Sequence, residues 1–124
     1  LLGASVMDFP KSPFLIQRVI SIASESSDIV MDFFAGSGTT GHAVMAQNEI
    51  DGCSRRYILV QLPESLSPEN KLQKTAADFC DQLGKPRTIA ELTKERLRRA
   101  ATKIRAASAG YTWFSSSLWI EMII

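Results

Sequence analysis

Residues 28–41 read DIVMDFFAGSGTTG and set the architecture of the chain. The run from Asp28 to Phe33 is apolar and rich in strand formers, which predicts a short strand buried on both faces. The glycines that follow have the spacing G-x-G-x-x-G, and residues 39–48 have the composition of a helix. The stretch therefore predicts a strand, a tight glycine loop and a helix in direct succession.

A second apolar run, residues 56–62, predicts the next strand. A strand, a crossover helix and a second strand form a βαβ unit, whose strands are expected to be parallel. Two more helices are expected on the C-terminal side, the first between Ser67-Pro68 and the stop at Gly84, and the second over residues 88–107. The predicted fold class is α/β.

The helices carry start signals and apolar stripes. Ser12 and Pro13 predict a helix over residues 13–24, with Ser12 capping its first amides, and Thr88-x-x-Glu91 is a capping box. The stripe expected to be buried in the first helix is Leu15, Ile16, Val19, Ile22 and Ala23. In the helix that ends before Gly84 it is Leu72, Ala76, Phe79, Cys80 and Leu83.

The composition is that of one ordinary globular domain, with 124 residues, 45% of them hydrophobic, and a net charge of +1. No apolar run approaches the roughly 20 residues of a membrane span, and no basic segment of a signal peptide opens the chain, so an intracellular protein without a membrane partner is expected. The two cysteines, Cys53 and Cys80, lack metal-ligand spacing and stand beside a single histidine. A metal site is therefore not expected.

The charge is unevenly distributed along the chain. Eight basic and two acidic residues lie between Lys85 and Arg105, a local balance of +6, whereas the rest of the chain carries −5. Arg96, Arg99 and Lys103 share one helical face without matching acids and are the candidate contacts to DNA phosphates. A solvated face is the competing interpretation, and Glu91 with Lys94 and Glu95 with Arg99 have the spacing of ion pairs.

The glycine loop is the candidate binding site. It lacks the Gly-Lys-Ser/Thr of a Walker loop, and the carboxylate of Asp32 just ahead of it would repel a pyrophosphate but attract an ammonium or sulfonium group. S-adenosylmethionine offers both of these cations, an apolar chain for Phe33 or Phe34, and a carboxylate for the helix amides of residues 38–40. A nicotinamide dinucleotide and a plain strand-to-helix turn without a ligand remain open.

Residues 32–44 resemble motif I of the amino-methylating DNA methyltransferases of the β arrangement. Further segments occur in the order of that family and are similar to the modification (Mod) subunit of type III restriction-modification systems: residues 9–16, residues 51–52 with 56–64, and residues 88–100. The resemblance covers about residues 9–105. It implies a partial Rossmann-like, S-adenosylmethionine-dependent methyltransferase fold, in which a parallel βαβ unit is flanked by helices.

The resemblance also implies a set of cofactor-binding residues. It places Lys11 and Ser12, in the motif X segment, near the cofactor carboxylate, and Gln61 where many methyltransferases bind the ribose hydroxyls. The complete set of expected cofactor contacts is Lys11, Ser12, Asp32, Phe33, Phe34, Ala35, Gly36, Ser37, Gly38, Thr39, Thr40 and Gln61. His42 is expected to pack in its helix rather than to act as a base.

Family members methylate the N6 of adenine in DNA with an Asp-Pro-Pro-Tyr motif, which this sequence lacks, so no catalytic residue is expected here. We expect residues 1–107 to be the C-terminal part of the catalytic domain and residues 108–124 to be a tail, added as a strand or cut short. The implied partners are double-stranded DNA, a restriction subunit and a second Mod subunit, in a bacterial cytoplasm. The alternatives are a nicotinamide-dependent oxidoreductase fragment and a basic-helix DNA-interaction module without a cofactor.

Overall fold

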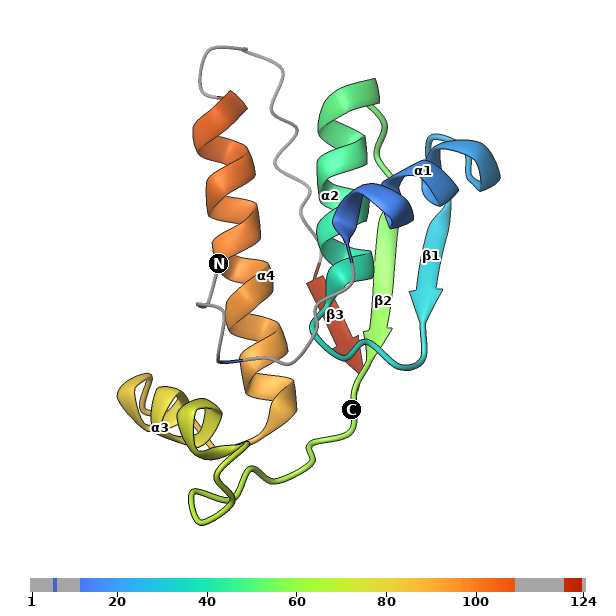
Figure 1. The fold of residues 1–124 in the computed structure, drawn as a ribbon. Coiled ribbons are helices and arrows are strands. Elements are labelled where there is room, and N and C mark those ends of the chain that lie inside the picture. Colours follow the sequence, from blue (N-terminus) through green and yellow to red (C-terminus); the bar gives the residue numbers. More distant parts are fainter. Residues whose placement is uncertain (1–5, 7–11, 109–119, 124) are drawn as a thin grey trace.

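The computed structural model describes residue 6, residues 12–108 and residues 120–123, and it has an α/β fold (Figure 1). Its elements in chain order are α1 (Pro13–Ala23), β1 (Ile29–Asp32), α2 (Thr39–Asp51), β2 (Arg56–Val60), α3 (Lys74–Gln82), α4 (Ile89–Ser108) and β3 (Ile120–Ile123). The expected succession of strand, glycine loop, helix and strand is confirmed. Lys11 and most of the tail fall outside the described residues.

The described strands form one sheet in the order β1-β2-β3. β1 is parallel to β2, with Ile29 opposite Arg56 and Asp32 opposite Leu59, as the βαβ pattern predicts. β2 is also parallel to β3, which lies within the segment expected to be a tail. Because the strands are parallel, the carboxyl ends of β1 and β2 lie at the same edge of the sheet, where the glycine loop begins.

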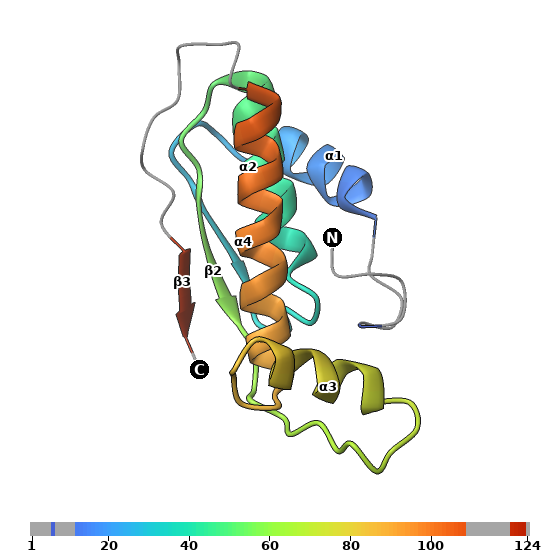
Figure 2. The ribbon, with the colours of Figure 1, turned by 90° about the vertical axis from the view of Figure 1, so that its left-hand side faces the viewer.

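The main core lies between the sheet and the helices α2 and α4. Ala43 and Val44 of α2, Leu59 of β2 and Leu97 of α4 are at most 1% exposed. Figure 2 shows α1, α2 and α4 on one side of the sheet. The expectation that β1 is buried on both faces is wrong, since Ile29 and Met31 are about half exposed on an edge strand that the described helices cover on one side.

The predicted bounds of α1 are confirmed to within one residue, but its predicted buried face is wrong except at Ile16. Gln17 and Ile20 are buried and Ile16 packs beside the main core, whereas Leu15 and Ile22 are 65% and 73% exposed. Apolar residues lie on more than one face of this helix, so the 3.6-residue period alone does not select the face that packs on α2. Ser12 stands at the N-cap position without a side-chain capping bond.

The start of α3 is also later than expected. Residues 68–73 form turns. The Asn70 side chain accepts a hydrogen bond from the amide of Leu72, and the Gln73 side chain accepts one from the amide of Ser67. Such side-chain bonds compete with helix formation. Leu72 is consequently 82% exposed, whereas Cys80 is fully buried in a second core cluster, as expected.

The long helix α4 agrees with its sequence signals. The Thr88 hydroxyl accepts a hydrogen bond from the amide of Glu91, as in a capping box. Both ion pairs expected from the spacing are present, Lys94 with Glu91 at 2.9 Å and Arg99 with Glu95 at 2.8 Å. None of the helices in the described part of the chain is long and apolar enough to cross a membrane.

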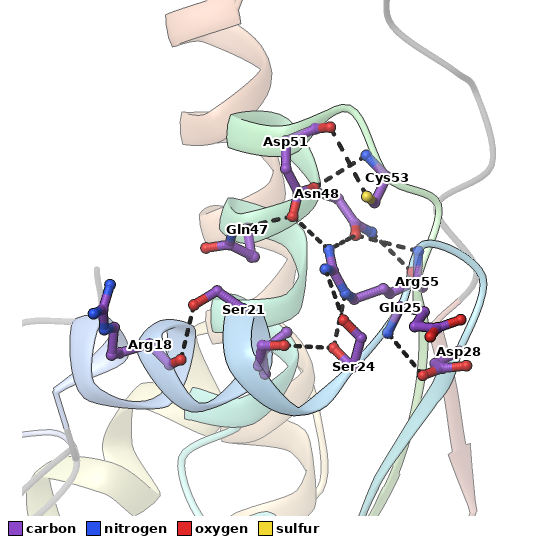
Figure 3. Close-up of polar contacts among 11 residues, drawn as sticks. Arg18, Ser21, Ser24, Glu25, Asp28, Gln47, Asn48, Asp51, Cys53 and Arg55 are labelled. Atoms are coloured by element: carbon purple, nitrogen blue, oxygen red, sulfur yellow. Dashed lines mark hydrogen bonds and ion pairs between the residues drawn. The ribbon is translucent and has the colours of Figure 1, made fainter.

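A cluster around Arg55 fastens the amino ends of the strands to α1 and α2 (Figure 3). The side chain of Arg55 is 4% exposed and pairs with Asp51 at 2.8 Å. Its guanidinium also donates to the hydroxyl of Ser24 at 2.9 Å and to the side chain of Asn48 at 3.4 Å. Burial alone would raise the pKa of Asp51, but hydrogen bonds from Gln47, Arg55 and Cys53 lower it to about 2.

Candidate cofactor-binding site

The glycine loop leaves β1 and turns directly into α2. The amide of Ala35 donates to the carbonyl of Val60 at 3.0 Å, which ties the loop to the end of β2, and the amide of Gly38 donates to the carbonyl of Ala35 at 2.7 Å. Gly38 is the N-cap of α2 and has a φ of +77°, a conformation that other residues rarely adopt. The turn thus depends on glycine at this position.

Two glycines are also required by close packing. A Cβ on Gly38 would lie 3.0 Å from Cγ2 of Thr93, and a Cβ on Gly41 would lie 3.0 Å from side-chain carbons of Leu59 and Leu97. Both positions bring the backbone of α2 and its loop against neighbouring elements more closely than a side chain would permit. The G-x-G-x-x-G spacing therefore has a structural cause in this fold.

Asp32, at the carboxyl end of β1, braces the loop. One carboxylate oxygen accepts a hydrogen bond from the amide of Phe34 at 3.0 Å, and the other accepts one from the hydroxyl of Thr40 at 2.6 Å. The side chain is only partly buried. A negative charge is thereby fixed at the mouth of the loop, beside the N-terminus of α2.

Gln61, just after β2, reaches the same loop. Its carbonyl oxygen accepts a hydrogen bond from the amide of Gly36 at 2.7 Å, and its amide nitrogen donates to the carbonyl of Leu62 at 3.2 Å. The structure therefore brings Gln61 together with the loop, as the sequence suggests. It also gives the side chain a bracing contact that the sequence does not reveal.

Helix α4 holds the loop from behind. The hydroxyl of Thr93 donates to the carbonyl of Gly36 at 2.5 Å, and Nη1 of Arg96 donates to the carbonyl of Ser37 at 3.2 Å. Nη2 of Arg96 lies 3.3 Å from Nδ1 of His42. The sequence does not single out Thr93 as a site residue, because its partner lies 57 positions away.

Burial determines the protonation state of His42 and shifts the pKa of Arg96. Burial and the positive charges of Arg96 and Lys103 lower the pKa of His42 to about 4, so its imidazole is neutral at pH 7. A guanidinium can only donate, so Nδ1 of His42 is the acceptor and its proton lies on Nε2. Burial lowers the pKa of Arg96, but an arginine remains charged in proteins.

The three candidate DNA contacts on α4 do not form one open basic face. Arg96 is 7% exposed and turned to the glycine loop, so its assignment to a DNA-facing surface is wrong for this fold. Arg99 pairs with Glu95 and lies 5.1 Å above the ring of Phe79, so the expectation of unmatched charge is also wrong there. Lys103 is exposed.

The other described residues among the expected cofactor contacts lie on or beside the loop, except Ser12, which is exposed at the start of α1. Phe33 and Phe34 are 64% and 90% exposed, whereas Ala35 is buried. The hydroxyls of Ser37 and Thr39 are 2.9 Å apart. The loop thus presents a carboxylate, exposed rings and the first amides of a helix, which suits a ligand with cationic, apolar and anionic parts.

Nothing in the described part of the chain forms a group of three or more His, Cys, Asp or Glu side chains that could hold a metal. In the loop, the hydroxyl of Thr40 donates to the carboxylate of Asp32, and the imidazole of His42 faces Arg96. These contacts hold the loop in place.

Comparison with known proteins identifies methyltransferases as relatives of this chain. Residues 8–66 match the model of a family described as DNA methylase. The chain is 44% identical over 106 residues to the type III restriction-modification enzyme StyLTI Mod subunit of Salmonella typhimurium, covering 86% of this chain and 15% of that protein. It is 41% identical over 91 residues to the EcoP15I Mod subunit of Escherichia coli, covering 73% of this chain and 13% of that protein.

A type II methyltransferase, M.KpnI of Klebsiella pneumoniae, is 41% identical over 61 residues, or 49% of this chain and 15% of that protein. The chain therefore spans about 15% of the length of the curated relatives that it matches. These matches favour a methyltransferase over the nicotinamide-dependent alternative. Over most of its length the chain is thus 37–44% identical to Mod subunits of type III restriction-modification enzymes, and residues 8–66 match the DNA methylase family.

Proposed function

We propose that this chain forms the S-adenosylmethionine-binding part of a site-specific DNA adenine-N6 methyltransferase, with a Rossmann-like fold. The observation that carries the proposal is the position of the Asp32 carboxylate, fixed beside a glycine loop at the carboxyl ends of parallel strands. Ligands of open α/β sheets bind at this edge. Double-stranded DNA, a restriction subunit, a second Mod subunit and a cytoplasmic setting belong to the same proposal for the whole protein.

The residues present fit each part of this cofactor. The carboxylate of Asp32 attracts the ammonium or the sulfonium, and the exposed rings of Phe33 and Phe34 suit the apolar chain. The first amides of α2 have no acceptor inside the helix and suit the carboxylate. The amide of Gln61 suits a ribose hydroxyl. When bound, the cofactor supplies the methyl group, and the residues of this chain bind and orient it.

A dinucleotide fits the loop less well. Its pyrophosphate would lie at the N-terminus of α2, close to the carboxylate of Asp32. Two neighbouring anions repel each other. A zwitterion places an anion at the helix amides and a cation at Asp32. The charge of one side chain therefore separates the two ligand classes.

Calorimetry with S-adenosylhomocysteine tests the proposal on the full chain. Asp32→Asn removes the charge but leaves an oxygen to accept from the amide of Phe34, whereas Asp32→Ala removes both. We expect Asp32→Asn to weaken binding roughly tenfold or more, as for the loss of a charge-assisted contact. The matched control is Asp28→Asn, at the other end of the β1 strand.

Two outcomes would reject the proposal. One is binding of S-adenosylhomocysteine that is unchanged in both Asp32 variants, and the other is stabilisation by NAD(P) without any by S-adenosylhomocysteine. A second measurement places the matched segment in the StyLTI Mod subunit, in exchange for that protein's own residues. The chimera is expected to methylate DNA and to lose this activity with Gly38→Val, because Gly38 has a positive φ and touches α4.

A further inference from the structure

Arg96 is a buried cation that forms no ion pair with the carboxylates of the described residues. The residue is 7% exposed, and its contacts are the carbonyl of Ser37 and the neutral ring of His42. Among the residues that the structure describes, the carboxylates of α4 pair with other bases, Glu91 with Lys94 and Glu95 with Arg98 and Arg99. A buried charge with neutral partners alone is costly, so an anion beside it would be strongly favoured.

Arg96 lies close to the N-terminus of α2. The carbonyl that Arg96 holds belongs to Ser37, two residues before the first residue of α2. A helix N-terminus carries a partial positive charge of its own and favours anions. The helix dipole and the guanidinium therefore both favour an anion at the N-terminus of α2, whereas the carboxylate of Asp32 favours a cation on the β1 side of the loop.

Thr93 controls the direction of the next amide. Its hydroxyl holds the carbonyl of Gly36 toward α4 at 2.5 Å. In a trans peptide the carbonyl and the following N–H point in opposite directions. The N–H of Ser37 is therefore directed away from α4, toward the side on which a ligand of the loop would lie.

We propose that Thr93 and Arg96 are positioning residues of the cofactor loop, and that the charge of Arg96 selects the carboxylate end of the ligand. This inference rests on the proposed function. Thr93 sets the orientation of a loop amide through Gly36, and Arg96 sets the loop through Ser37 and supplies a positive charge. Helix α4 thus serves the cofactor site from behind, through backbone carbonyls.

The test of the charge compares S-adenosylhomocysteine with its decarboxylated analogue, which keeps the amine and lacks the carboxylate. Arg96→Gln is expected to weaken binding of S-adenosylhomocysteine about tenfold and of the analogue less than about twofold. Arg96→Lys keeps the charge and is expected to restore the preference. Arg98→Gln is the matched control, because Arg98 lies on the same helix with its side chain 53% exposed.

The test of the positioning role uses Thr93→Val and Thr93→Ser. Valine keeps the shape of threonine but loses the hydrogen bond to Gly36, so both ligands are expected to bind about threefold more weakly. Serine keeps the hydroxyl and is expected to bind both ligands as the unchanged chain does. A role in folding alone would lower the midpoint of unfolding in Thr93→Val and leave its ligand affinities unchanged.

The outcomes separate this inference from the function on which it rests. If the unchanged chain binds neither ligand, the proposed function and the inference both fall. If it binds S-adenosylhomocysteine but Arg96→Gln and Thr93→Val bind both ligands as Arg98→Gln does, only the inference falls. If Arg96→Gln lost the same factor of affinity for both ligands, Arg96 would not select the carboxylate. It would then only hold the loop in position.

Discussion

Helix α2 has a buried arginine at each end, and the two are compensated differently. Arg55, at the C-terminal end, pairs with the carboxylate of Asp51 and with oxygen atoms of Ser24 and Asn48. Arg96, at the N-terminal end, contacts a carbonyl and a neutral imidazole. The first charge is neutralised within the fold, and it lies where the helix dipole favours a cation.

This difference distinguishes a structural cluster from a site. A cation at the C-terminus of a helix with a carboxylate partner is satisfied and has no need of a ligand. A cation at the N-terminus of a helix whose hydrogen-bond partners are neutral forms no ion pair with them, and it favours an anionic ligand group nearby. Burial alone, which the two arginines share, does not tell them apart.

The largest effect is expected at Arg55. Arg55→Met leaves Asp51, Ser24 and Asn48 without their common partner, and it removes three hydrogen bonds of a buried guanidinium at once. We expect the free energy of unfolding to fall by about 4 kcal/mol, measured by urea denaturation. The neighbouring exposed Arg56→Met is the control, with an expected change within about 0.5 kcal/mol. Equal losses in the two variants would refute the structural role of Arg55.

The next largest effect is a pH dependence at the opposite end of α2. The pKa of His42 is about 4 in the folded chain and 6.5 ordinarily, so between these values the unfolded chain binds a proton that the folded chain does not. Stability contributed by neutral His42 is therefore complete above pH 6.5 and is lost as the pH falls toward 4, by at most about 3 kcal/mol.

His42→Gln tests this dependence, because glutamine keeps a neutral acceptor for Arg96. Urea denaturation from pH 7 to pH 4 is expected to show a smaller slope of stability against pH in the variant. Asp51 does not interfere, since its pKa of about 2 moves the corresponding loss of stability below pH 3.8. An unchanged slope in His42→Gln would mean that the pH dependence does not come from the half-buried imidazole of His42.

The sequence predicts most of this fold because its signals are local. The apolar strands, the glycine loop and the capping box of α4 depend on neighbouring residues, and the structure agrees with them. Which face of a helix or strand is buried depends on elements elsewhere. The exposure of Leu15 and Met31 follows from the one-sided covering of the sheet and the packing of α1, which periodicity does not contain.

The candidate site divides in the same way. The position of Asp32, the loop glycines and Gln61 follows from the end of each strand, and the structure brings them together. The part contributed by α4 is not accessible to sequence reasoning, because Thr93 and Arg96 meet the loop across more than 50 positions. The helical spacing of the basic residues therefore predicts an exposed Arg96, although the structure buries it.

The two glycines that flank α2 differ in what surrounds them. Gly38 and Gly52 have φ values of +77° and +68°, but a Cβ on Gly38 would meet Thr93 and Leu97, whereas nothing lies within 4 Å of one on Gly52. Gly52→Ala carries backbone strain of about 1 kcal/mol, and Gly38→Ala adds overpacking for a total of about 2–3 kcal/mol. Urea denaturation measures both, and equal losses would show that α4 does not press on the loop.

The smallest effect is expected at a third arginine, Arg99, three positions beyond Arg96 on α4. It pairs with Glu95 and lies over the ring of Phe79, with its side chain 40% exposed. Exposed pairs of this kind contribute less than about 1 kcal/mol and weaken with salt. Arg99→Gln should therefore lower stability slightly at low salt and still less at 1 M NaCl. Arg96→Gln should show a loss that salt does not reduce, since its partners are neutral and its charge is shielded from solvent ions by burial. If salt reduced the loss of stability equally in both variants, Arg96 would behave as a surface charge. The contrast between Arg96 and Arg55 at the two ends of α2 would then be wrong.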